Sequence, residues 1–209
     1  MEWMKEKKIS LTRRGEALRA PRWLNEDFGG ELSGPNPGLD RQVMELKFRS
    51  LGFPNFCYEP PVGRAEGFCV AWRQGLFIEP MEVSKHLIRC IVHCEPSLEP
   101  WMLAAVYGPS RDIERATFWE KVKNEASVSN LPWLLVGDLN STLFSSERSG
   151  LGTSRHAQQR STTLCRCVEE LGLIDLGVIG GKFSWRNRRF GKAFTQARLD
   201  RALCNMRWR

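Results

Sequence analysis

Two strongly apolar runs separated by one helical pattern limit the possible folds more than any other feature. The first run lies in WMLAAVYGPS at 101–110, and the second begins WLLVGDLN at 133–140. An uninterrupted apolar run of this kind is typical of a strand that is covered on both faces. Between them, residues 112–127 predict a helix, because Phe118 and Val122 lie four positions apart on one face. The sequence therefore predicts buried strands with a helix between them.

Other patterns extend this arrangement along the chain. Apolar residues at helical spacing predict helices at about 39–52 and 156–170. Short apolar or alternating runs predict further strands at 67–72, 85–95, 181–187 and 197–203. Because the helices fall between buried strands, we expect an α/β (α+β) layered domain with a mixed sheet or a pair of sheets.

Residues 1–38 have a different composition from the rest of the chain. They are basic at first and then rich in Gly, Pro, Asn and Ser. Such a composition is typical of loops, so we expect an irregular or disordered segment here. The folded domain is expected to span residues 39–209.

Charge and cysteine usage bear on partners and location. The formal net charge of +7 suits a polyanion such as DNA or RNA, although solubility alone could also explain it. The seven cysteines include no CxxC pair, and no apolar stretch has the length of a signal peptide or a membrane span. We therefore expect reduced thiols, no disulfide-linked partner and no membrane, in an intracellular protein of the nucleus.

The second apolar run ends in residues that could carry chemistry. Gly137 allows a turn or a close approach of the backbone, and Asp138 and Asn140 follow it two positions apart. If the strand continues, both side chains point to the same face. A carboxylate and an amide there could hold Mg²⁺ or a phosphate, with the carboxylate accepting a proton. The alternative is an Asx-type turn that only closes the strand.

Several motifs occur in a fixed order along the chain. They are LGFPNFCYEPPVGRAEGFCVAW (51–72), VYGPS (106–110), WLLVGDLN (133–140), ERSG (147–150), GLIDLG (172–177), GGKFSWRN (180–187) and ARLDRAL (197–203). In this order they resemble the endonuclease/exonuclease/phosphatase superfamily, and in detail the endonuclease domain of plant LINE-type (non-LTR) retrotransposons. The resemblance implies a DNase I-like four-layer α/β sandwich and a phosphodiesterase that needs Mg²⁺ or Mn²⁺ and cuts DNA.

The resemblance also implies roles for four residues. Asp138 would orient or deprotonate the attacking water, Asn140 would steady the phosphate oxygens, and both would bind the metal. Tyr107 would donate a hydrogen bond to the phosphate, and Asp200 would orient a catalytic histidine. Fixed donors and a cation suit such a reaction because its transition state is anionic. Without the resemblance, Tyr107 could be a core tyrosine, and Asp200 could pair with a neighbouring arginine.

Two parts of the family pattern have no match in these 209 residues. The family begins with a strand carrying Asn and a second strand ending in a metal-binding Glu, and it ends with a Ser-Asp-His motif. Glu45 in MELK lies in a helical pattern, and all three histidines (His86, His93 and His156) precede the RLD segment. The resemblance thus implies a partial sandwich without its first and last strands, with weak or no activity. The alternatives are a non-catalytic nucleic-acid-binding remnant or an unstable relic.

A basic segment near the C-terminal end is the candidate nucleic-acid-binding surface. It contains Trp185, Arg186, Asn187, Arg188 and Arg198. Basic groups beside an aromatic ring suit a nucleic-acid backbone and a stacked base. The alternative is a solvated hairpin in which the tryptophan belongs to the core.

Overall fold

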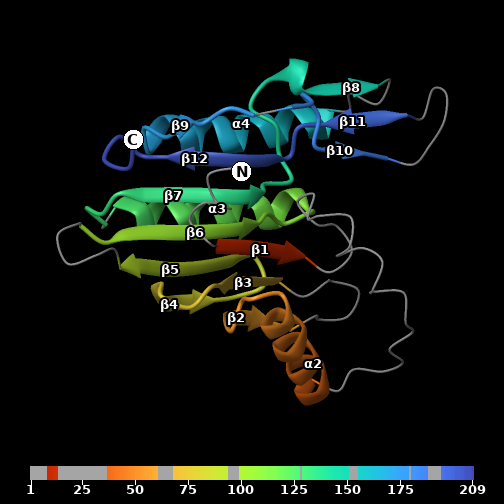
Figure 1. Ribbon diagram of the computed structural model, residues 1–209. Helices are drawn as coiled ribbons and strands as arrows, with labels where there is room; N and C mark the ends of the chain where they lie inside the picture. Colours follow the sequence, from red (N-terminus) through yellow and green to blue (C-terminus); the bar gives the residue numbers. More distant parts are fainter. Residues whose placement is uncertain are drawn as a thin grey trace. The chain divides into compact units, whose positions relative to one another are not determined.

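The computed structural model describes residues 9–13, 37–60, 68–93, 99–127, 129–150, 155–178, 180–187 and 194–209. The chain divides into two compact units, Met1–His93 and Cys94–Arg209. Figure 1 labels the helices and strands of both.

The described residues of the first unit form a three-stranded antiparallel sheet, a helix and a hairpin. The strand order is β1 (Ile9–Arg13), β3 (Phe68–Trp72), β2 (Asn55–Glu59). Helix α2 (Pro37–Ser50) packs its buried Phe48 against Cys69 and Ala71 of β3. The hairpin consists of β4 (Phe77–Val83) and β5 (Leu87–His93). Helix α2 confirms the expected helix, and it places Glu45 on a helix as its sequence context indicates.

Strand β1 lies within the segment that was expected to be irregular. Its sequence ISLTR alternates apolar and polar residues, which is a strand pattern, and each of its five residues pairs with β3. The expectation of irregular structure was wrong at these five positions. It rested on the composition of residues 1–38 as a whole, in which the Gly- and Pro-rich part outweighs the short strand pattern. The remainder of residues 1–36 lies outside the described residues, and the boundary at residue 38 stays a prediction.

The second unit is built on a sheet with the strand order β6-β7-β12-β9 (Figure 1). Its strands are β6 (Trp101–Tyr107), β7 (Trp133–Asp138), β12 (Asp200–Cys204) and β9 (Ile174–Asp175). Strand β6 runs parallel to β7, since α3 (Asp112–Ser127) connects them, and β12 runs antiparallel to β7. The sheet is mixed, and the expected α/β class is confirmed.

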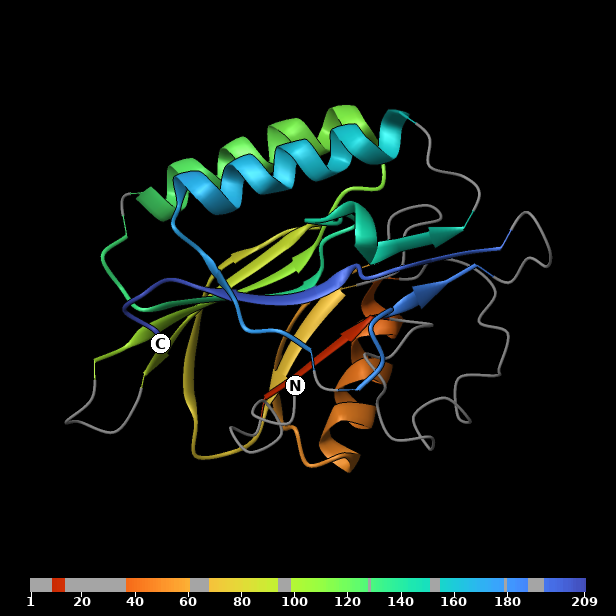
Figure 2. The same ribbon diagram turned by 90° about the horizontal axis from the view of Figure 1, so that it is seen from above.

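The remaining elements of this unit lie beside that sheet. A small antiparallel sheet has the order β10 (Trp185–Arg186), β11 (Thr195–Ala197), β8 (Arg148–Gly150). The short helix η2 (Ser145–Glu147) leads into β8. Helices α3 and α4 (Arg155–Glu170) lie side by side on one face of the larger sheet (Figure 2). The expected helices at 112–127 and 156–170 are therefore confirmed, while the four-layer arrangement stays a prediction.

The packing between helices and sheet explains the apolar runs. Trp119 of α3 and Leu164 of α4 are buried, as are Leu103 of β6 and Leu135 of β7. The side chain of Lys123 on α3 reaches Glu170 at the end of α4. In the parts of the chain that the structure describes, no helix is long and apolar enough to cross a membrane. Each of the six cysteines described there is a free thiol.

Cys167 provides a test of this packing. Its side chain is buried, and burial raises the pKa of the Cys167 thiol to about 12. At pH 8 the native protein is expected to carry about 10³-fold less Cys167 thiolate than the unfolded chain, since an unperturbed cysteine has a pKa of about 8.5. Iodoacetamide labelling before and after addition of urea, followed by mass spectrometry, measures this ratio. Trypsin cleaves at Arg166 and so separates Cys167 from Cys165. Equal labelling rates in the two states would contradict the packing of α4.

Candidate active site

Three of the predicted site residues form a row across three neighbouring strands. Tyr107, the last residue of β6, is the Cα partner of Asp138, the last residue of β7. Asp138 is in turn the Cα partner of Asp200, the first residue of β12. Partners in register project from the same face of a sheet, and directly opposed antiparallel residues have Cβ atoms about 5 Å apart. The sheet therefore brings a phenol and two carboxylates together at one edge.

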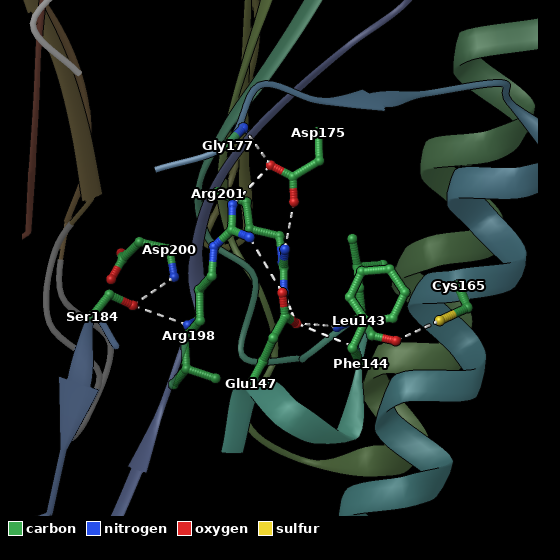
Figure 3. Close-up of polar contacts among 11 residues, drawn as sticks. Leu143, Phe144, Glu147, Cys165, Asp175, Gly177, Ser184, Arg198, Asp200 and Arg201 are labelled. Carbon is green, nitrogen blue, oxygen red and sulfur yellow. Dashed lines mark hydrogen bonds and ion pairs between the residues drawn. The ribbon is translucent and has the colours of Figure 1, made fainter. Parts of the chain in front are cut away.

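The row projects from the face of the sheet opposite to the helices. Arg201 follows Asp200 in β12 and pairs with Glu147, whose carboxylate also accepts the Leu143 N–H. The Leu143 carbonyl accepts a hydrogen bond from Cys165 of α4, so Arg201 projects toward the helices. Successive residues of a strand point to opposite faces, which directs Asp200 away from α4. Figure 3 shows the Asp200 side chain on the side of β12 away from α4.

Asn140 is fixed beside this row by two hydrogen bonds. Its backbone N–H donates to Asp138 Oδ1 at 2.8 Å, and its side-chain Nδ2 donates to the Gly108 carbonyl at 2.6 Å. The first bond is the Asx-type turn that the sequence allows, so the turn and the site geometry coexist. Asn140 has φ of +48°, a left-handed conformation that asparagine tolerates better than most residues. Non-glycine residues in this conformation cluster at functional sites.

Glycine at position 108 allows the two strand ends to approach closely. A Cβ atom at Gly108 would lie 2.4 Å from the Leu139 carbonyl oxygen. The Gly108 N–H donates to the Asp138 carbonyl at 2.7 Å, and Leu139 N–H donates to the Leu199 carbonyl at 2.9 Å. The chain after β6 and the start of β12 are thus both hydrogen-bonded to the chain around Asp138.

Ser184 holds the start of β12. Its hydroxyl oxygen accepts hydrogen bonds from the backbone N–H of Leu199 at 2.9 Å and of Asp200 at 3.0 Å (Figure 3). Two bonds to adjacent amides fix the position at which Asp200 enters the strand. Ser184 lies in the motif GGKFSWRN, but nothing in the sequence of this motif indicates that the serine binds the backbone at the start of β12.

A buried ion network lies behind the row, and the sequence reasoning missed it. Arg198 reaches Glu147 at 3.2 Å and Asp175 at 2.8 Å, while Arg201 reaches Asp175 at 2.6 Å and also pairs with Glu147 (Figure 3). Glu147 and Arg201 are only 4% and 3% exposed. The four residues come from three of the sequence motifs: ERSG contributes Glu147, GLIDLG contributes Asp175, and ARLDRAL contributes both arginines. The fixed order of the motifs indicated that these segments belong to one site. Their spacing along the chain does not show which acidic side chain pairs with which arginine.

Glu147 has further partners that make it sensitive to substitution. Its Oε2 also accepts hydrogen bonds from the backbone N–H of Leu143 at 2.8 Å and of Phe144 at 3.1 Å. Glu147→Gln is expected to lower the free energy of unfolding by about 3 kcal/mol, because it leaves the buried Arg201 and the half-buried Arg198 short of one negative charge. Urea denaturation followed by circular dichroism measures the change. The control is Glu99→Gln, which removes an exposed ion pair with Arg207 and should cost less than about 1 kcal/mol. Equal effects of the two substitutions would refute the assigned importance of the network.

The residues predicted to bind nucleic acid are not equivalent. Arg186 is exposed and Trp185 is half-buried on β10. Asn187 Oδ1 accepts the backbone N–H of Thr195 at 2.9 Å and so stabilises the β10–β11 hairpin. The Arg198 guanidinium is held by two carboxylates, and its contact with nucleic acid stays a prediction. Arg188 lies outside the described residues.

The oxygen donors at the row are few, but they are of the kind that a hard cation binds. Among the described residues, no three His, Cys, Asp or Glu side chains are grouped so that they could hold a metal ion. Asp138 and Asp200 are cross-strand neighbours on one face, and Asn140 adds an amide. Mg²⁺ is commonly held by one or two carboxylates together with waters and substrate phosphates, so this donor set suits it. His93 lies in β5 of the other unit, where it contacts Glu79 and Phe77.

Comparison with solved structures shows the same fold in two endonucleases and a phosphatase. The endonuclease domain of TRAS1, a telomere-specific non-LTR retrotransposon, matches at 16% identity with a TM-score of 0.52, covering 80% of this chain and 78% of that one. An AP endonuclease from Archaeoglobus fulgidus matches at 14% identity with a TM-score of 0.61, covering 98% and 79%. The 3′ phosphatase NExo from Neisseria, bound to a product DNA hairpin, matches at 14% identity with a TM-score of 0.51, covering 77% and 70%. At these identities the likeness shows a shared DNase I-like α/β fold.

The sequence comparisons give the family. A search of curated proteins finds no match. The model of the Endonuclease/Exonuclease/phosphatase family matches residues 16–207, which include the row and the ion network. On this match the chain belongs to the Endonuclease/Exonuclease/phosphatase family.

Proposed function

We propose that this chain is a metal-dependent phosphodiesterase that nicks DNA, derived from the endonuclease of a non-LTR retrotransposon. The observation that carries the proposal is the register that aligns Tyr107, Asp138 and Asp200 on one face, with Asn140 fixed beside them. Support also comes from the family match and from the shared fold with the TRAS1 endonuclease domain.

Each residue of the row has a role in this proposal. Asp138 orients the attacking water and accepts its proton, because its carboxylate lies at the end of β7 and is held by the Asn140 backbone. The Asn140 side chain, anchored through Gly108, presents the rest of its amide to the phosphate oxygens. The Tyr107 hydroxyl donates to the same phosphate. Asp200 supplies a second carboxylate at the row.

A divalent cation suits the electrostatics of this row. Two carboxylates on directly opposed residues repel each other, and a cation between or beside them relieves that repulsion. Mg²⁺ or Mn²⁺ would be held by Asp138, with Asn140 and Asp200 close by. When bound, such an ion neutralises charge on the phosphate.

We propose that these 209 residues have low activity by themselves. They carry no Ser-Asp-His motif, and the three histidines His86, His93 and His156 all precede Asp200 in the sequence. A group that stabilises the transition state contributes several kcal/mol, and each ~1.4 kcal/mol changes the rate tenfold. The expected rate is therefore far below that of an enzyme with the full set.

Binding of DNA without cleavage is the second candidate. The exposed Arg186 beside the half-buried Trp185 and the net charge of +7 favour it. RNA would offer the same phosphates and bases to this hairpin. With DNA as the substrate or ligand, we place the protein in the nucleus.

A plasmid-nicking assay tests the proposed function. Supercoiled plasmid is incubated with the chain and Mg²⁺. We expect slow conversion to open circles, and this conversion should stop when a chelator is added. A parallel preparation of Asp138→Ala should give no conversion, which excludes a contaminating nuclease. Equal conversion by both preparations would refute the proposed site. If neither converts the plasmid but labelled DNA is retained and released by salt, the second candidate stands instead.

A further inference from the structure

Arg115, on the first turns of α3, is a buried guanidinium that the proposed mechanism does not use. It is 1% exposed, although its helix begins only a few residues after the site. Arginine is rarely buried unless it is paired, so a buried arginine at this position needs a structural reason. The contacts of Arg115 supply one.

The guanidinium holds the loop that follows β6. Arg115 Nη1 donates to the Pro109 carbonyl at 2.8 Å and to the Ser110 carbonyl at 2.7 Å. The guanidinium also pairs with Asp112, one turn earlier in α3. Arg115 holds both carbonyls through Nη1 and Asp112 through Nη2, an arrangement that the single nitrogen of a lysine does not reproduce.

The same loop carries the anchor of Asn140. Gly108 directly precedes the clamped carbonyls, and its own carbonyl accepts the Asn140 Nδ2 hydrogen bond at 2.6 Å. On its other side Gly108 N–H donates to the Asp138 carbonyl. Movement of the clamped carbonyls would therefore move the acceptor that orients the Asn140 amide.

We infer that Arg115 is a positioning residue that fixes the Asn140 amide in its productive orientation through the Gly108–Ser110 loop. The inference rests on the proposed function for its effect on rate, but its effect on Asn140 can be measured without activity. Small misplacements of a positioning group lower rates strongly, so the loop must be held from behind.

The chain offers a matched control at the opposite end of the same strands. Asn205 is also a loop clamp: its side chain accepts the Trp133 N–H at 2.9 Å and donates to the Leu131 carbonyl at 2.9 Å. It holds the start of β7, whereas the loop held by Arg115 lies at the end of β6. Asn205→Ala therefore removes a comparable loop clamp without touching the anchor of Asn140.

The test is a double-mutant cycle together with a spectroscopic measurement. Arg115→Lys is expected to lower the nicking rate about 10-fold, but less than about twofold when Asn140 is already alanine, because coupled residues are not additive. Asn205→Ala should change the rate by the same factor in both backgrounds. In ¹⁵N–¹H spectra, the Asn140 side-chain amide signal, identified by its loss in Asn140→Ala, should shift in Arg115→Lys and stay in place in Asn205→Ala.

The possible outcomes separate this inference from the proposed function. If the wild-type chain does not nick DNA, the proposed function fails, and the Asn140 amide signal still decides the role of Arg115. An unmoved signal in folded Arg115→Lys overturns the inference, as does a rate loss that is additive with Asn140→Ala. Should Arg115→Lys not fold, Asp112→Asn weakens the same clamp, and it must move the same signal for the inference to hold.

Discussion

Asp138→Asn is expected to lower the nicking rate by about 10³-fold without unfolding the protein, since it removes the proposed base but keeps the shape of the side chain. Asparagine retains an oxygen that can accept the Asn140 N–H, so the turn after β7 should persist. The substitution also removes a negative charge from the face where DNA would bind. Affinity for DNA should therefore stay constant or rise while the rate falls.

Two measurements separate catalysis from binding in this variant. Nicking under conditions of saturating plasmid gives the rate, and retention of labelled DNA at several salt concentrations gives the affinity. Glu99→Gln serves as the control, because it also removes one negative charge but from an exposed ion pair. If Asp138→Asn nicks at the rate of Glu99→Gln, Asp138 does not take part in the reaction.

The sequence predicted the central part of this fold well, for a physical reason. Strands β6 and β7 are buried along almost their whole length, so their apolar runs are long and uninterrupted. Helix α3 lies between them in the sequence, and its position was also correct. The motif order predicted Tyr107, Asp138 and Asp200 as site residues, and the register shows that they share one edge and one face of the sheet.

The parts that could not be predicted depend on contacts between distant segments. Strands β8, β9 and β11 have only two or three residues, too few to show a period of two. The ion network joins residues up to 54 positions apart, namely Glu147 and Arg201, and nothing local distinguishes these charges from exposed ones. Arg198 illustrates this, because a basic residue of a kind suited to DNA is held by the buried Glu147 and the half-buried Asp175.

Gly137→Ala is expected to destabilise the protein by at least about 4 kcal/mol, enough to unfold many domains of this size. Gly137 has φ of +141°, and a Cβ atom there would lie 2.0 Å from the Val106 carbonyl oxygen. Val106 is the Cα partner of Gly137 in the β6–β7 pair, so the clash is with backbone that is itself held in the sheet. The clash could be relieved only if β6 and β7 moved apart. This movement would occur directly beside the residue pair Tyr107 and Asp138.

Gly180→Ala separates this clash from backbone strain. Gly180 also has a positive φ, +102°, but a Cβ atom there would meet no heavy atom within 4 Å. Its alanine variant should therefore lose only about 1–2 kcal/mol, the cost of the left-handed conformation itself. Urea denaturation compares the two, with limited proteolysis as the measurement if Gly137→Ala does not fold. Similar losses in both variants would mean that β6 and β7 are not packed as closely at the candidate active site as the structure shows.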